Sequence, residues 1–145
     1  MSTDLYAIIR IRGSVNARKE IEDTMEMLKL KKVNNCMLYP KNPIIGGMLK
    51  KARTYLTWGE ISEKALLDLL LKRGRLAGNK KLDDKKAKEE LEKLLKEKSH
   101  KNLEIKLPLR LSPPSKGYSS VKQAYPKGDY GYRKEKINEL IDRMI

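Results

Sequence analysis

The stretch from Leu107 to Arg133 combines cationic and aromatic side chains in a pattern that suits RNA binding. Its basic residues are Arg110, Lys116, Lys122, Lys127 and Arg133, and its tyrosines are Tyr118, Tyr125, Tyr130 and Tyr132. Cations neutralise phosphates, and flat rings offer faces to unstacked bases. No helical or strand period continues after Leu111, and so long a loop in a compact domain is usually functional or disordered. The alternative is a solvated surface loop whose tyrosines fold back on the core.

Further basic residues are predicted at the ends of elements elsewhere in the chain. They are Arg10 and Arg12 on a strand end, Lys50, Lys51 and Arg53 at a helix end, and Arg73, Arg75, Lys80 and Lys81 in the connector 72–81. With the five basic loop residues and Tyr118, Tyr125 and Tyr130, they form the candidate RNA-binding set. Tyr132 could join this set or anchor the final helix.

Positive charge is spread along the whole chain. The formal net charge is +14 over 145 residues, and residues 1–62, 63–106 and 107–145 contribute +5, +5 and +4. A basic protein is drawn to polyanions because binding releases condensed counterions. The helix-turn-helix, zinc-finger and aromatic RNA-recognition patterns are absent, so backbone and shape recognition of a folded RNA fits better than sequence reading of DNA.

Residues for catalysis or metal binding are scarce. The one histidine, His100, lies among lysines in a connector, and the one cysteine, Cys36, lies in an apolar run typical of a buried position. One His and one unpaired Cys leave few groups for acid–base or covalent chemistry. We therefore predict no catalytic residue, no metal site, no cofactor and no small-molecule substrate.

The sequence predicts a soluble cytoplasmic protein that does not enter a membrane. Asp4 falls where a signal peptide would be basic, and no apolar h-region follows it. No run approaches the ~18 apolar residues of a membrane span. No helix pairs a Trp- or Phe-rich face with a wholly basic one, as a membrane-surface helix would.

The first sixty residues predict a β-α-β-α-β unit. Alternating apolar residues predict a strand over 5–12, and a helical period predicts a helix over 17–29. The apolar run 33–39 predicts a second strand, and residues 55–58 predict a third strand that ends at Gly59. Between these strands Pro43 opens a short helix, which Gly46 and Gly47 weaken, an indication that another group approaches the backbone there. Such a unit can close one core with helices on one face of a sheet.

The remaining chain predicts an extension of this α+β core. Ser62 caps a helix over 63–73, and Asp83 or Asp84 caps a helix that runs to about residue 98. Alternation predicts an edge or irregular strand over 104–111, and a 3.6-residue period predicts a docked helix over 134–144. We expect a core domain over 1–61, a helical extension with a basic connector over 62–106, and an extended RNA-facing segment with a docking helix over 107–145.

Several sequence motifs together resemble a known family. The segments LYAIIRIRG, LKLKKVNNC, GMLKKARTYLTWGEI, LLLKRGRL, LRLSPPSKG, KGDYGYR and INELIDRM follow one another from end to end. The chain resembles the archaeal members of the large-subunit ribosomal protein family numbered thirty in bacteria and archaea and seven in eukaryotes. Leu109 and Tyr118 stand where relatives often carry Phe.

The resemblance implies a fold and a role. It implies a three-stranded sheet with two helices on one face, related to the ferredoxin-like class, with strand order 3-1-2. It also implies a structural, non-enzymatic constituent of the large ribosomal subunit that binds large-subunit ribosomal RNA and contacts neighbouring ribosomal proteins. The alternative is a small basic enzyme that processes or modifies RNA.

Overall fold

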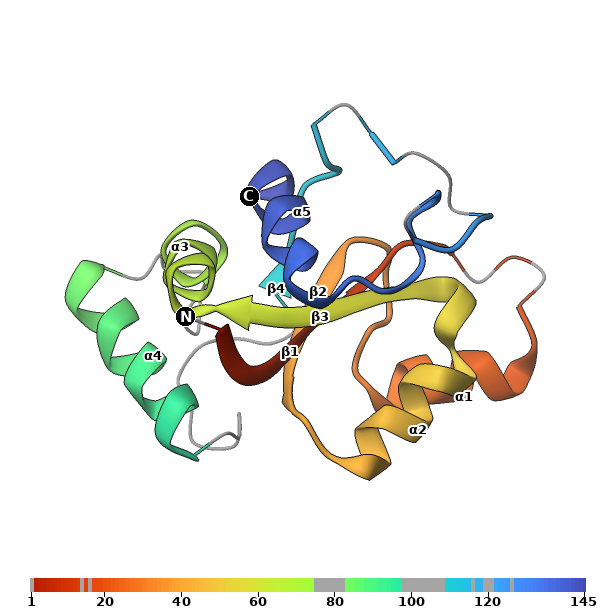
Figure 1. Ribbon diagram of the computed structural model, residues 1–145, viewed down its shortest axis with the longest axis horizontal. Coiled ribbons are helices and arrows are strands. Elements are labelled where there is room, and N and C mark those ends of the chain that lie inside the picture. Colours follow the sequence, from red (N-terminus) through yellow and green to blue (C-terminus); the bar gives the residue numbers. More distant parts are fainter. Residues whose placement is uncertain are drawn as a thin grey trace.

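The computed structural model describes residues 2–13, 15, 17–74, 83–97, 109–115, 117–118, 122–125 and 127–145 (Figure 1). The elements are β1 (Ser2–Arg10), α1 (Lys19–Met27), β2 (Asn35–Pro40), α2 (Pro43–Lys51), the 3-10 helix η1 (Arg53–Tyr55), β3 (Leu56–Ser62), α3 (Glu63–Arg73), α4 (Asp84–Glu97), β4 (Leu109–Arg110), β5 (Gly131–Tyr132), the 3-10 helix η2 (Lys134–Lys136) and α5 (Ile137–Met144). This order confirms the predicted α+β class and its β-α-β-α-β start. His100 and most of the predicted strand 104–111 lie outside the described residues.

The sheet has the order β4-β2-β1-β3-β5, which contains the implied 3-1-2 arrangement. Strand β1 is antiparallel to both core neighbours, with Ile9 opposite Cys36 on β2 and opposite Thr57 on β3. The short strand β4 pairs antiparallel with β2, and β5 pairs parallel with β3. Two pieces of the C-terminal segment therefore cover the two outer edges of the core sheet.

One face of the sheet packs against α1 and α2. Ile8, Met37 and Trp58 project from the strands, the helices contribute Met25, Ile45 and Leu49, and Leu28 follows the end of α1. The side chain of Asn42 caps α2 by accepting a hydrogen bond of 2.8 Å from the backbone N–H of Ile45, directly before Pro43 at the helix start. This face matches the two-helix arrangement that was expected.

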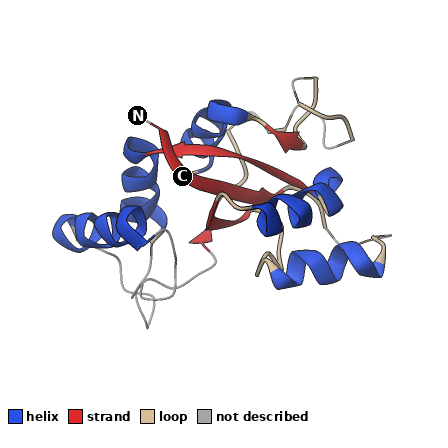
Figure 2. Cartoon of the chain, turned by 60° about the horizontal axis from the view of Figure 1, so that its bottom comes forward, coloured by secondary structure: helices blue, strands red, loops and turns tan. Residues whose placement is uncertain are grey.

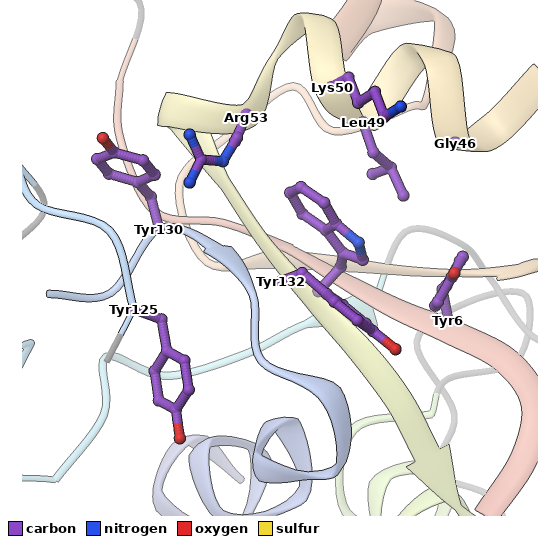
Figure 3. A pocket seen from close by; sticks show the side chains of 9 residues that line it. Tyr6, Gly46, Leu49, Lys50, Arg53, Tyr125, Tyr130 and Tyr132 are labelled. Carbon is purple, nitrogen blue, oxygen red and sulfur yellow. The ribbon is translucent and has the colours of Figure 1, made fainter. Parts of the chain in front are cut away.

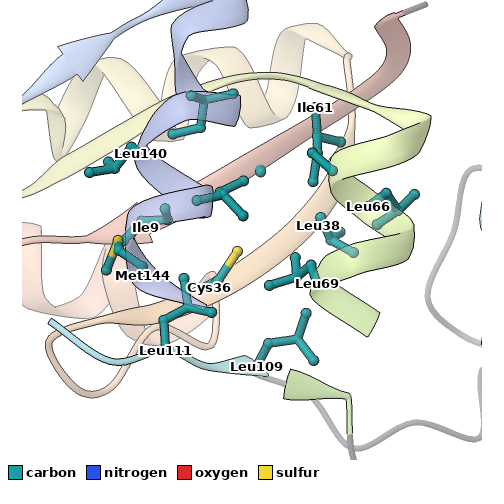
Figure 4. Close-up of a cluster of buried hydrophobic side chains, with 14 of the residues drawn as sticks. Ile9, Cys36, Leu38, Ile61, Leu66, Leu69, Leu109, Leu111, Leu140 and Met144 are labelled. Atoms are coloured by element: carbon teal, nitrogen blue, oxygen red, sulfur yellow. The ribbon is translucent and has the colours of Figure 1, made fainter. Parts of the chain in front are cut away.

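The other face of the sheet is also covered, by α3 and α5 (Figure 4). Ile9, Cys36, Leu38 and Ile61 meet Leu66 and Leu69 of α3 and Leu140, Ile141 and Met144 of α5. The sheet thus lies between two groups of helices (Figure 2). Burying each large aliphatic side chain contributes about 1.5–3 kcal/mol, so α5 is held firmly. The docked C-terminal helix is confirmed from Ile137 to Met144, with a 3-10 turn before it.

Gly59 lies in the middle of β3, so the prediction that the strand ends there is wrong. A Cβ atom at this position would lie 2.0 Å from the carbonyl oxygen of Lys134 and 3.0 Å from the Cβ of Ile137. Glycine is present because the turn before α5 crosses the strand at this point, and not because the strand stops.

Helix termini in the extension follow their predicted caps. Ser62 Oγ accepts a hydrogen bond of 3.1 Å from the Ala65 N–H at the start of α3. Asp83 Oδ1 accepts one of 2.8 Å from the Lys86 N–H at the start of α4. The segment after β4 then satisfies the end of α5, because the N–H groups of Ser112 and Ser115 donate to the carbonyl oxygens of Met144 and Arg143.

Cys36 is fully buried, as predicted, and burial raises the pKa of its thiol to about 12. A thiol in the unfolded chain has a pKa of about 8.5 and therefore loses its proton first, so the free energy of unfolding falls as the pH rises from about 9 to 12. We expect a Cys36→Ala variant to lose less stability than the parent between neutral and alkaline pH. Urea unfolding of both proteins at two pH values tests this, and equal losses would contradict it.

Candidate nucleic-acid interface

The end of α2 presents an exposed basic group of side chains. Lys50 and Lys51 occupy the last turn of the helix, where a cation is favoured by the partial negative charge of the free carbonyl groups. Arg53 follows in η1, and its guanidinium carbon lies 5.4 Å from the centre of the Tyr130 ring. This cation–π contact ties the end of α2 to the returning C-terminal segment.

The loop that precedes β5 is closed by its own backbone. The N–H of Tyr125 donates to the carbonyl oxygen of Tyr130 at 2.9 Å. The N–H of Asp129 donates to the carbonyl oxygen of Gln123 at 3.0 Å. At Gly128 a Cβ atom would lie 2.1 Å from the Gln123 carbonyl oxygen, so only glycine fits this closure. Lys122 and Lys127 are exposed on this loop.

Arg133 is buried beneath this loop. Its Nη2 donates to Asp129 Oδ1 at 2.6 Å and to the Asp129 carbonyl oxygen at 3.0 Å. Its Nε donates to Thr57 Oγ1 at 2.7 Å, and Thr57 Oγ1 donates to the Gly131 carbonyl oxygen at 3.0 Å. The guanidinium also lies over the Tyr125 ring. Arg133 therefore fixes the loop on β3 and has only 7% of its surface exposed.

A cleft of about 440 Å³ opens between α2, β3 and the C-terminal segment, and we call it the aromatic cleft (Figure 3). Its lining residues are Tyr6, Gly46, Leu49, Lys50, Arg53, Trp58, Tyr125, Tyr130 and Tyr132. The Trp58 and Tyr132 rings are stacked with centroids 6.3 Å apart, and Tyr6 meets Tyr132 edge to face at 6.2 Å. These geometries are the preferred ones for aromatic pairs, so the floor of the cleft is preorganised.

Polar contacts hold the Tyr132 ring in place. Its hydroxyl donates a hydrogen bond to Glu60, and Lys41 Nζ lies 2.9 Å from Glu60 Oε1. Partial burial opposes the charge on Glu60, but the hydrogen bonds from Tyr132 and Lys41 outweigh it and lower the carboxyl pKa. Glu60 is therefore ionised at neutral pH and engaged by both partners. The ion pair with Lys41 offsets its negative charge beside the cleft.

The structure brings together part of the predicted RNA-binding set. Lys50, Arg53, Tyr125 and Tyr130 line the aromatic cleft, and Lys51, Lys122 and Lys127 are exposed. Arg110, on β4, is exposed at the opposite edge of the sheet. Arg12 lies half-buried over the Tyr55 ring. Arg75, Lys80, Lys81 and Lys116 lie outside the described residues.

Other members of the predicted set have their polar groups directed inward. Arg10 is 4% exposed and donates to the carbonyl oxygens of Leu30 and Arg12, each at 2.8 Å. Arg73 donates to Ser112 Oγ. The Tyr118 hydroxyl donates to Asn34 Oδ1 at 2.8 Å, and burial raises the pKa of this hydroxyl to about 12. With Arg133, these residues have structural contacts, and we leave them out of the interface proposed below.

Sequence reasoning missed two rings of the cleft, those of Tyr6 and Trp58, and it left Tyr132 open between the RNA-binding set and an anchor for the final helix. Tyr6 shares a face of β1 with Ile8, and Ile8 lies opposite Trp58 on β3. Trp58 in turn lies beside Tyr132 on β5. Strand alternation gives the face of each residue, but only the register between strands places the three rings together.

Two kinds of feature are absent from the described residues. No three His, Cys, Asp or Glu side chains in this part of the chain are grouped as metal ligands would be. None of its helices is both long enough and apolar enough to cross a bilayer.

Comparison with known proteins identifies the family. The family described as ribosomal protein L30p/L7e matches residues 6–56, from β1 to the start of β3. Proteins named large ribosomal subunit protein uL30 match along almost all of the chain. The one from Nanoarchaeum equitans is 48% identical over 97% of this chain and 99% of its own length. Those from Methanococcus vannielii and Methanosphaera stadtmanae are 43% and 42% identical over 97% of this chain and 99% and 100% of theirs. With identities this high along the whole fold, the chain belongs to the ribosomal protein L30p/L7e family.

Proposed function

We propose that this protein is a structural, non-enzymatic constituent of the large ribosomal subunit in the cytoplasm. In this role it binds and stabilises large-subunit ribosomal RNA and contacts neighbouring ribosomal proteins. Support for the subunit comes from the relatives, which carry that name over nearly their full length. Support for RNA binding comes from the net charge of +14 and from the basic groups around the aromatic cleft.

One observation supports this surface above others. Exposed Lys50 and Arg53 line one cleft with Tyr125 and Tyr130, which come from a distant part of the chain, and the exposed Lys51 follows Lys50 in the last turn of α2. Two nearby carboxylates, Asp129 and Glu60, are ion-paired with Arg133 and Lys41. Because these two carboxylates are already paired, the cations of this surface can replace the counterions of an RNA backbone.

A triple variant tests the surface. In the Lys50→Ala/Lys51→Ala/Arg53→Ala variant we expect the affinity for transcribed large-subunit RNA to fall. The slope of log affinity against log salt should also decrease by roughly 2 to 3, because each lost phosphate contact removes about 0.7–0.9 from it. Filter binding of the full chain at several salt concentrations measures both quantities.

A charge-matched variant is the control. Lys64, Lys85 and Lys88 are exposed on α3 and α4, away from α2 (Figure 1), so their replacement by alanine removes the same net charge elsewhere. An equal loss of slope in both triple variants would show that the overall charge, and not this surface, carries the binding. Sedimentation with large subunits through high salt separates the structural role from an RNA-processing enzyme, which would dissociate.

A further inference from the structure

We propose that the aromatic cleft holds one unpaired nucleotide of the bound RNA. The base lies against the rings of Trp58, Tyr132 and Tyr6, and its phosphate lies toward Lys50 and Arg53. This inference rests on the proposed function and adds to it, because a surface that only neutralises the phosphates of an RNA helix needs no cleft.

The size and walls of the cleft suit a flat ligand. Its volume of about 440 Å³ lies within the range of small-molecule sites. The rings of Trp58 and Tyr132 are already stacked, and Tyr132 is fixed by its hydrogen bond to Glu60. Bases of any sequence stack on such rings, so recognition here would tolerate different bases.

Trp58 is only 8% exposed and lies at the floor of the cleft. A base inside a duplex cannot present its face to so recessed a ring, whereas a base extruded from a loop or bulge can. The cleft therefore selects single-stranded or unpaired positions of the RNA.

The charges are distributed as a nucleotide would require. The two cations come from the α2 side, whereas the Tyr6 and Tyr132 rings lie across the cleft on the sheet side (Figure 3). Glu60, the carboxylate beside Tyr132, is neutralised by Lys41. A ligand with one aromatic part and one anionic part fits this arrangement, and a nucleotide has both.

Gly46 gives independent support. A Cβ atom at Gly46 or at Gly47 would meet no atom within 4 Å, so internal packing requires glycine at neither position. Glycine in a helix nevertheless costs stability relative to other residues. Gly46 lines the cleft. A bound group that approaches the α2 backbone explains why position 46 carries no side chain.

The single tryptophan of the chain reports directly on the cleft. Three probes are compared on the full-length protein: a single-stranded oligoribonucleotide, the same sequence as a duplex, and heparin, a polyanion without bases. We expect the single strand to quench Trp58 fluorescence. Heparin should bind without quenching, and the duplex should quench weakly.

Leucine substitutions at two neighbouring glycines test whether single-strand binding and the quenching of Trp58 occur in the cleft. Gly46→Leu and Gly47→Leu both replace a helical glycine, but only the first places a side chain in the cleft. We expect Gly46→Leu to weaken single-strand binding about tenfold and to abolish the quenching, whereas Gly47→Leu leaves both unchanged. Heparin affinity should be the same in both variants.

The possible results separate the two proposals. Equal effects of the two glycine variants, or equal quenching by heparin and single strand, would overturn the cleft assignment while salt-dependent binding of ribosomal RNA still supports the proposed function. Quenching that appears only with ribosomal proteins, and never with RNA, would assign the cleft to a protein and also overturn it. Failure to bind ribosomal RNA at all would refute the proposed function itself.

Discussion

A Gly59→Ala variant is expected to lose about 3 kcal/mol of unfolding free energy, the upper part of the usual range for overpacking. The added Cβ would lie 2.0 Å from the Lys134 carbonyl oxygen. This neighbour is backbone and cannot move aside by changing a rotamer. Either β3 or the turn before α5 must shift, and α5 then loses part of its contact with the sheet. Urea unfolding followed by Trp58 fluorescence measures the loss.

Gly13→Ala is the control for this effect. A Cβ at Gly13 would lie 4.0 Å from Val33 Cγ2, which is ordinary van der Waals contact. We expect its unfolding midpoint to stay close to that of the parent. If both variants unfolded at the parent midpoint, the close crossing of β3 by the turn before α5 would be contradicted.

Replacing Arg133 is expected to destabilise the protein by about 3–5 kcal/mol, the usual cost of removing one partner from a buried ion pair. In Arg133→Met the Asp129 carboxylate loses its counter-ion, and only 3% of Asp129 is exposed. The Thr57 hydroxyl loses the hydrogen bond that it accepts from Arg133. The double variant Asp129→Leu/Arg133→Met should recover a large part of the loss, because it leaves no buried charge behind.

Lys127→Met serves as the comparison for Arg133. Lys127 is exposed on the same loop, so its replacement should change stability by less than about 0.5 kcal/mol and lower the salt slope of RNA binding by about 0.7–0.9. The two variants thus separate a loop-building arginine from a phosphate-binding lysine. If Arg133→Met left stability unchanged and lowered the salt slope, Arg133 would belong with the phosphate contacts after all.

Local patterns were sufficient to predict most of the fold. Alternating apolar residues from Leu5 to Ile11 gave β1, and Pro43 and the Ser62 cap gave the starts of α2 and α3. These signals act within one turn or one strand. Gly59 was misread because a glycine in a strand pattern can mark an end or a close approach, and the group that approaches it is Lys134, far along the chain.

The site was predictable in composition and less so in position. Lys50, Arg53, Tyr125 and Tyr130 were predicted from their chemistry and do line one cleft. Residue type alone does not distinguish an exposed arginine such as Arg53 from a buried one such as Arg133. Burial depends on the Thr57 hydroxyl and the Asp129 carboxylate being brought into reach, which only the pairing of β5 with β3 accomplishes.

The two short outer strands also have a consequence for how the chain folds during synthesis. Asn35 pairs with Arg110 and Thr57 with Gly131, so each partner is made long after the core strand that it covers. Until then β2 and β3 have open edges, which favour pairing with other chains, and Ile9 and Leu38 lack the cover of α5. Contacts between such distant segments form slowly. The nascent core is therefore vulnerable to aggregation until its last third emerges, and completing the chain is the step that protects it.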